Sequence, residues 1–183
     1  MRASTEGYRT PARLLHWVTA VLVLGLIPAG FVMIQKGIPR PLQDTLFVFH
    51  KNAGVLVLLL VLVRLVYRRM NPPPPLPDSV TGIQRLAAEA THVLLYGLLF
   101  LMPVAGYVRV RAGGFPIESL DALGIPALVP RSDALADFAK GVHFFGGWTI
   151  ALLVAMHVGA ALMHGIVKKD GVFSRMWPPI GPR

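Results

Sequence analysis

The stretch GVHFFGGWTIALLVAMHVGAALMHG, residues 141–165, decides how this chain folds. It is long enough to cross a bilayer, since a helix needs about 20 mostly apolar residues to span roughly 30 Å of hydrocarbon. Yet it carries His143, His157 and His164, half of the six histidines in the chain. Ionisable residues inside a membrane span are costly and usually face the interior of a helix bundle. The stretch therefore predicts a membrane helix with one functional face.

Three further stretches have the same length and apolar character, and Pro28 and Pro103 inside two of them are compatible with kinked membrane helices. The composition agrees, because 54% of the 183 residues are hydrophobic and only 15% are charged, against roughly 25% charged in soluble domains. We expect an all-α integral membrane four-helix bundle that forms one domain over residues 1–183. The four predicted spans are about 14–34, 46–66, 86–108 and 142–167.

The net charge of +9 reflects topology and lipid headgroups, not nucleic-acid binding. With the N-terminus placed inside, the inner segments hold eleven basic and four acidic residues, and the outer segments hold the other seven basic and five acidic ones. This excess follows the positive-inside rule and predicts four crossings with both termini cytoplasmic. The inner charges are Arg2, Arg9, Arg13, Arg64, Arg68, Arg69, Arg85, Lys168, Lys169, Arg175 and Arg183, with Glu6, Asp78, Glu89 and Asp170.

The longest predicted loop joins the third and fourth spans, at about 109–140. Its segment FPIESLDALGIPALVP, residues 115–130, mixes apolar and polar residues and predicts a short helix over the outer face. Long loops in compact domains are often functional, and a plain surface cover fits this one equally well.

The chain contains no cysteine. Disulfides, thiolate metal sites, iron–sulfur clusters and covalently attached c-type haem are therefore excluded. Any cofactor must be held by other side chains, of which histidine is the obvious one.

The histidines of the fourth span share one face. At about 100° per residue, positions 14 apart differ by about 40° and positions 7 apart by about 20°. His143, His157 and His164 therefore align, and a rise of about 1.5 Å per residue puts His143 and His157 roughly 21 Å apart. That separation suits the irons of two haems stacked across a bilayer.

The other spans supply histidines at matching depths. His50 lies four residues after position 46, and His143 lies four after position 139 if the fourth helix begins there. His16 matches His157 when depth is counted from the outer helix ends, but it is closer to His164 when depth is counted from the inner ends. Depth alone leaves the inner partner open between these two.

Small residues favour a flat ligand beside the histidines. A macrocycle bonded to a histidine needs room one helical turn away, and Ala20, Gly54, Gly147 and Ala161 stand at that offset after His16, His50, His143 and His157. Small residues are also common at membrane helix contacts. Zinc and copper sites gather three or four ligands in one pocket, whereas these histidines separate into an outer pair and an inner group, which suits two haems better.

Five segments together resemble the bacterial cytochrome b561 family over nearly the whole chain. They are YRTPARLLHW at 8–17, FHKNAG at 49–54, THVLLYGLLFLMPVAGY at 91–107, KGVHFFGGWTIALLVAMHVGAALMH at 140–164, and KKDGVFSRMWP at 168–178. The 14-residue histidine spacing in the fourth segment is the most specific of these.

The resemblance implies a four-helix protein of the bacterial inner membrane that binds two haem b groups through histidine pairs. Carried over, His50 and His143 hold the outer haem, and His16 and His157 hold the inner one. His92 and His164 are then not ligands and become candidate contacts for haem propionates, quinone or a proton relay.

The resemblance also implies an activity, because members of the family resemble superoxide oxidases that reduce ubiquinone. Lys51, Arg109, Arg111 and Lys140 are the candidate residues for attracting superoxide to the outer haem. Propionate pairing or headgroup contact fits these cations equally well. Two alternatives stay open: the cytochrome b subunit of a quinone-linked dehydrogenase, with a redox protein as electron donor, and a haem-free, histidine-lined proton or metal transporter.

Overall fold

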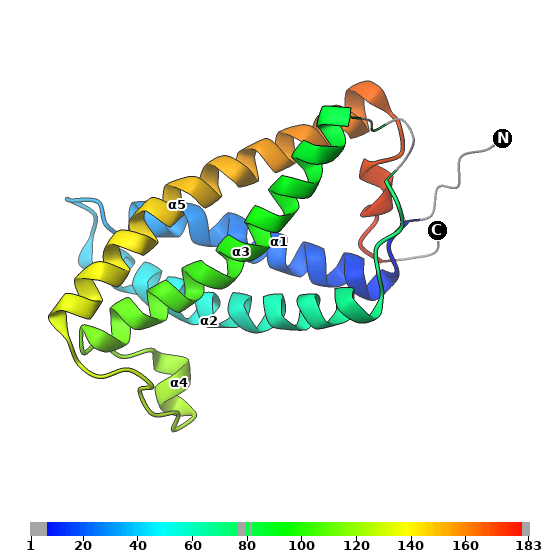
Figure 1. Cartoon of the computed structure of the whole chain (residues 1–183). Helices are drawn as coiled ribbons and strands as arrows, with labels where there is room; N and C mark the ends of the chain where they lie inside the picture. The colour runs from blue at the N-terminus through cyan, green and yellow to red at the C-terminus, as the bar shows by residue number, and fades with distance from the viewer. Residues whose placement is uncertain (1–6, 77–79, 81, 181–183) are drawn as a thin grey trace.

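Four long helices make up most of the computed structural model, which describes residues 7–76, 80 and 82–180 (Figure 1). Each is long and apolar enough to cross a membrane, and the described part of the chain contains no strand. The predicted all-α membrane fold is confirmed. The helices are α1 (Thr10–Val32), α2 (Arg40–Met70), α3 (Gly82–Ala112) and α5 (Asp133–Leu162), with a short α4 (Glu118–Ala122), a π-helix (Met163–Lys168) that continues α5, and a 3-10 turn (Phe173–Arg175).

Two aspects of the predicted organisation stay predictions, namely the single domain and the cytoplasmic position of both termini. We call the end of the bundle where α2 and α5 begin the outer end, following the predicted topology, and the opposite end the inner end. Four residues of the charge count, Arg2, Glu6, Asp78 and Arg183, lie outside the described residues.

Most of the long helices extend beyond their predicted spans. Helix α2 begins at Arg40 and α5 at Asp133, each six residues before the start used in the depth comparison. The reason is physical: hydropathy marks the part of a helix within hydrocarbon, whereas the hydrogen-bonded helix continues into the headgroup region and water. The loop expected at 109–140 accordingly shortens to residues 113–132, and α4 is the short helix expected within it.

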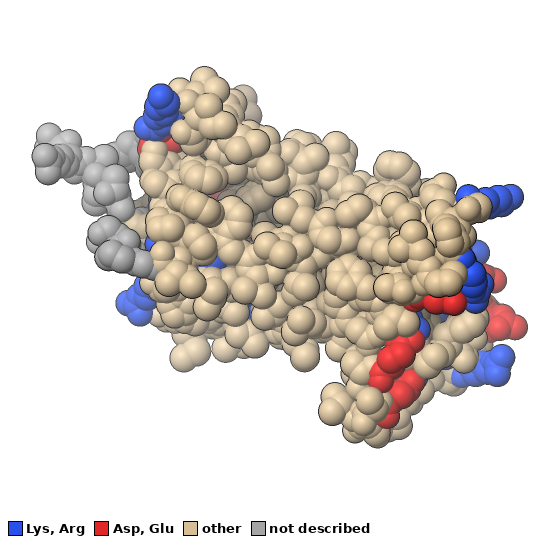
Figure 2. All heavy atoms as spheres, turned by 180° about the vertical axis from the view of Figure 1, so that it is seen from behind, with Lys and Arg blue, Asp and Glu red and all other residues tan. Residues whose placement is uncertain are grey.

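The helices pack in sequence order, α1 on α2, α2 on α3, and α3 on α5. A small core forms around Val23, Val57 and Val61, which are at most 7% exposed. Many large apolar side chains, such as Leu59 at 55% and Leu152 at 63%, point outwards. Figure 2 shows that Lys, Arg, Asp and Glu gather at the two ends and leave the middle of this face bare. A bare apolar band between charged ends fits a bundle solvated by lipid.

The inner end is closed by chain segments from three parts of the sequence. The Trp17 indole donates a hydrogen bond to the Met176 carbonyl at 2.8 Å. The buried Arg175 guanidinium donates to the carbonyls of Pro74 and Pro75 at 2.9 and 2.7 Å. Hydrogen bonds from a charged donor contribute about 1.5–3 kcal/mol each. These contacts hold the segment after α5 and the proline tract against the start of α1.

Candidate functional site

His50 of α2 and His143 of α5 face each other at the outer end. Each lies ten residues after the first residue of its helix, Arg40 and Asp133, so the depth match found in the sequence persists although both helices begin earlier. Their ring centres are 6.0 Å apart and their planes are inclined by 76°.

A hydrogen bond orients the His143 ring. Its Nδ1 lies 3.0 Å from the Met102 carbonyl oxygen of α3. A carbonyl only accepts, so Nδ1 carries the proton and donates it, which leaves the Nε2 lone pair of a neutral ring available. Histidines that bind metals are commonly oriented in this way by a second hydrogen bond. His143 is therefore arranged to coordinate through Nε2.

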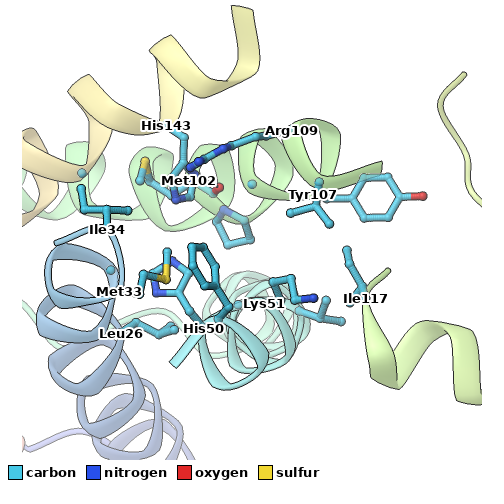
Figure 3. Close-up of a pocket in the computed structure, with 18 of the residues that line it drawn as sticks. Leu26, Met33, Ile34, His50, Lys51, Met102, Tyr107, Arg109, Ile117 and His143 are labelled. Atoms are coloured by element: carbon cyan, nitrogen blue, oxygen red, sulfur yellow. Dashed lines mark hydrogen bonds between the residues drawn. The ribbon is translucent and has the colours of Figure 1, made fainter. Parts of the chain in front are cut away.

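A cavity of about 1,220 Å³ surrounds the outer pair. Pockets for drug-sized ligands measure roughly 300–1,000 Å³, so this one has room for a large group. Its walls are mainly apolar, and Figure 3 shows His50 and His143 reaching into it from different helices, with Arg109 extending along α3 towards His143. The apolar part of the lining includes Val23, Leu26, Phe47, Leu99 and Ile150.

Two glycines on opposing helices make room for the histidine rings. A Cβ on Gly30 of α1 would lie 2.9 Å from His50 Cε1, and a Cβ on Gly106 of α3 would lie 3.1 Å from His143 Cε1. Neither glycine was predicted from the sequence, because small residues were sought only one turn along the histidine's own helix. Gly54, which was predicted in that way, also lines the cavity. No spacing rule identifies a glycine that meets a histidine across a helix interface.

The inner end brings three histidines together. The His157 ring of α5 lies 6.2 Å from His16 of α1 and 5.5 Å from His92 of α3, centre to centre. His164 is buried and pairs instead with Asp170, with 2.6 Å between Nδ1 and Oδ2. Burial by itself would raise the pKa of Asp170, but the hydrogen bonds with His164 and with the Val172 backbone N–H, together with nearby positive charge, lower that pKa overall.

Both predicted pairs have the separation that one iron between two imidazoles requires. A metal–imidazole bond is about 2 Å long and the ring centre lies roughly 1 Å farther, so two rings on opposite sides of one metal are roughly 6 Å apart. The His50–His143 and His16–His157 distances of 6.0 and 6.2 Å match. Within the described residues, no three or more histidine, aspartate or glutamate side chains are grouped to hold a metal ion directly.

The four outer cations differ in their partners. Lys51 Nζ is 2.6 Å from Glu118 Oε1 and 2.8 Å from the Pro116 carbonyl oxygen, and Arg111 is 2.5 Å from Asp121 Oδ1. These ion pairs attach α4 to the ends of α2 and α3. Lys51, Arg109 and Lys140 line the cavity, and the latter two form no ion pair within 4.0 Å among the described residues.

The ion pairs also hold the α4 carboxylates in their charged forms. Burial would raise the pKa of Glu118, but hydrogen bonds from Lys51 and Asn52 lower it overall. The hydrogen bond from Arg111 lowers the pKa of Asp121.

Four membrane-length helices that bring imidazoles together at two separate levels form the arrangement of a membrane cytochrome. Comparison with known proteins agrees. The sequence model of the prokaryotic cytochrome b561 family matches residues 7–179, and the chain belongs to this family. Membership makes it a multi-pass bacterial membrane protein of electron transfer that binds haem b, so the resemblance seen in the sequence is confirmed.

Curated relatives extend over almost the same length. Cytochrome b561 homolog 2 of Escherichia coli (strain K12) is 34% identical over 172 residues, which cover 93% of this chain and 91% of that protein. Cytochrome b561 homolog 1 of the same organism is 28% identical, covering 90% and 93%. A Yersinia pestis protein named probable superoxide oxidase CybB is 26% identical, covering 90% and 92%.

Proposed function

We propose that this chain holds two haem b groups and oxidises superoxide at its outer face while reducing ubiquinone. His50 and His143 hold the outer haem, and His16 and His157 hold the inner one. The observation that carries the proposal is the presence of two histidine pairs at nearly equal ring separations, 6.0 and 6.2 Å, at opposite ends of a membrane bundle. The proposed location is the bacterial inner membrane with both termini in the cytoplasm.

Haem b, when bound, supplies the one-electron redox chemistry. The protein orients the ligands: the Met102 carbonyl fixes the His143 ring with Nε2 free, and Gly30 and Gly106 leave space for the outer imidazoles. The mainly apolar part of the cavity wall would pack against the macrocycle.

Superoxide as electron donor is supported by the printed name of the Yersinia pestis relative and by the outer cations. Lys51, Arg109 and Lys140 all line the cavity, and Arg109 and Lys140 would attract a small anion there, whereas the charge of Lys51 is compensated by Glu118 and that of Arg111 by Asp121. The net reaction balances as two superoxide anions, one ubiquinone and two protons giving two dioxygen molecules and one ubiquinol.

His92 and His164 remain candidates for the quinone and proton side of the reaction. His92 contacts the His157 ring, and His164 is joined to Asp170 near the inner end. Either position fits a quinone or propionate contact, and the His164–Asp170 pair also fits a proton relay.

A reduced-minus-oxidised spectrum of the purified protein tests the haem part of the proposal. We expect a sharp b-type α-band and two haems per chain. A preparation without this band would contradict the proposal and favour a histidine-lined transporter.

Mixing the oxidised protein with superoxide tests the substrate. We expect haem reduction without any partner protein, followed by reoxidation when ubiquinone is added. Arg109→Gln should slow the reduction and weaken its dependence on salt. Arg111→Gln, at a paired cation that does not line the cavity, serves as the matched control. If superoxide reduces no haem, the chain is better explained as the cytochrome subunit of a quinone-linked dehydrogenase.

A further inference from the structure

Two arginines of α2 lie beside the inner histidines. Arg64 and Arg68 are one helical turn apart, and both guanidinium groups stand over the Tyr96 ring of α3, with Cζ 5.2 and 5.9 Å from its centre. Arg64 Nη2 is also 3.4 Å from Nδ1 of His16. Both lie in a helix with the length and composition of a membrane span.

These two positive charges have no carboxylate partner in the described parts of the chain. Among residues 7–76, 80 and 82–180, the ion pairs within 4.0 Å involve Arg40, Lys51, Arg111 and His164, but neither Arg64 nor Arg68. Arg64 is half-buried, and a charge withdrawn from water costs several kcal/mol unless an opposite charge and hydrogen bonds compensate it. Stacking on Tyr96 offsets part of that cost and supplies no negative charge. Arg64 therefore calls for an anion, and the exposed Arg68 places a second positive charge over the same ring.

The contact between Arg64 and His16 points to the same requirement. A guanidinium only donates, so the contact suits His16 with Nδ1 as acceptor and the proton on Nε2. An imidazole that binds iron through Nε2 needs the reverse arrangement, with Nδ1 as donor. Arg64 and a ligating His16 would be two donors facing each other, and an acceptor with negative charge near Arg64 removes the conflict. Carboxylates match a guanidinium best because they bind it through two parallel hydrogen bonds.

We propose that Arg64 and Arg68 form a carboxylate-binding site that receives the propionate groups of the inner haem. Arg64 turns from His16 to the carboxylate, and this leaves His16 free to adopt the tautomer that a ligand needs. The inference rests on the proposed haem between His16 and His157 and assigns the residues that anchor its acidic side.

The test is a redox titration of the purified protein followed by its haem spectrum, with haem content measured on the same samples. A nearby positive charge stabilises the reduced haem. Arg64→Gln and Arg68→Gln should therefore each lower the reduction potential of the inner haem or lower the amount of it that is bound. The component assigned to the inner haem is the one that His157→Ala removes. Arg64→Lys should recover part of the shift, because it restores the charge without the two-pronged geometry. Arg69→Gln, at an exposed position on the same turn, is the matched control and should change neither component.

The outer haem is the internal control for folding. If Arg64→Gln removes the inner component while the outer one keeps its potential, the loss belongs to the inner site and supports the proposal. Unchanged potentials and haem content in both Gln variants would overturn it. A wild-type protein with only one haem component would instead overturn the proposed function beneath it.

The phosphate of a lipid headgroup also has anionic oxygens that arginine binds. A second experiment distinguishes it from the haem propionates. The titrations are repeated in nanodiscs of phosphatidylcholine alone and of phosphatidylcholine with phosphatidylglycerol. If the propionates are the ligands, the Arg64→Gln shift is the same in both. A shift that appears only with the anionic lipid would assign the arginines to headgroups and overturn the propionate site.

Discussion

At the outer end of the bundle Lys51 and Arg111 pair with carboxylates of α4, whereas Arg64 and Arg68, towards the inner end, have no carboxylate within 4.0 Å among the described residues. The close contacts of these two arginines include the Tyr96 ring and, for Arg64, His16. The ring separations of the two histidine pairs are nevertheless almost equal. For the two haems proposed here, similar ligand geometry in two different electrostatic fields would give chemically identical groups different reduction potentials.

Replacing a histidine proposed to bind haem should have the largest effect on the difference between the two ends. We expect His143→Ala to abolish the outer haem and His157→Ala the inner one, each lowering haem content from two per chain to about one. Absorbance spectra normalised to protein measure the loss. His164→Ala is the matched control from the same helix face and should keep both haems, since His164 is bonded to Asp170. Loss of the inner haem in His164→Ala with its retention in His157→Ala would show that the inner pairing is wrong.

Adding a side chain beside a haem-binding histidine at the outer end should have the next largest effect, and it should affect only the outer haem. In Gly30→Ala the new Cβ would lie 2.9 Å from His50 Cε1, so the ring must move. Overpacking of this kind costs about 1–3 kcal/mol, and we expect weaker retention of the outer haem with the inner haem unchanged. Haem loss to a scavenger protein measures it. Gly97→Ala, where a Cβ meets nothing within 4 Å, is the control; equal effects of both substitutions would contradict the packing argument.

A smaller effect is expected when the buried pair at the inner end is broken. Asp170→Asn removes the charged partner of His164, whose hydrogen bond contributes about 1.5–3 kcal/mol. The melting temperature should fall by a few degrees, with haem content at low temperature unchanged. Asp137→Asn, at an exposed position on α5, should leave the melting temperature unaltered. A result in which Asp170→Asn melts like the wild type would mean that the pair adds no stability.

The smallest effect concerns the attachment of α4 at the outer end. The pKa of Glu118 is lower in the folded protein than in the unfolded chain. The charged Glu118 side chain therefore stabilises the attachment of α4 fully above the ordinary pKa of a glutamate, and this stabilisation is lost as the pH falls through the lowered value. Hydrogen exchange of residues 115–125 should therefore become faster in acid, while exchange in α2 stays constant. Glu118→Gln should exchange fast at every pH and show no such transition. If Glu118→Gln showed the same acid transition as the wild type, Glu118 would not be its cause.

The sequence predicts those features that depend on a single helix. Helical periodicity placed His143 and His157 on one face, and the depth match of His50 with His143 survived because α2 and α5 both begin six residues early. The helices extend past the predicted spans, since polar residues such as Asp44 and Asp137 are also helical.

Features that depend on two helices were not predicted. The sequence analysis counted Arg64 only as a topological charge, and no pattern along the chain places it against Tyr96 and His16. The pairing of Lys51 with Glu118, 67 residues away, is equally invisible in the sequence. Such contacts depend on how helices are oriented about their axes, which side-chain packing decides.

The hydrogen bond between Trp17 and Met176 joins residues 159 positions apart. A ribosome adds about 5–20 residues per second, so roughly ten to thirty seconds separate the synthesis of the two partners. During that interval the inner end of α1 lacks its contact with the segment after α5. The proposed inner haem would therefore bind only after α5 and that segment have been made.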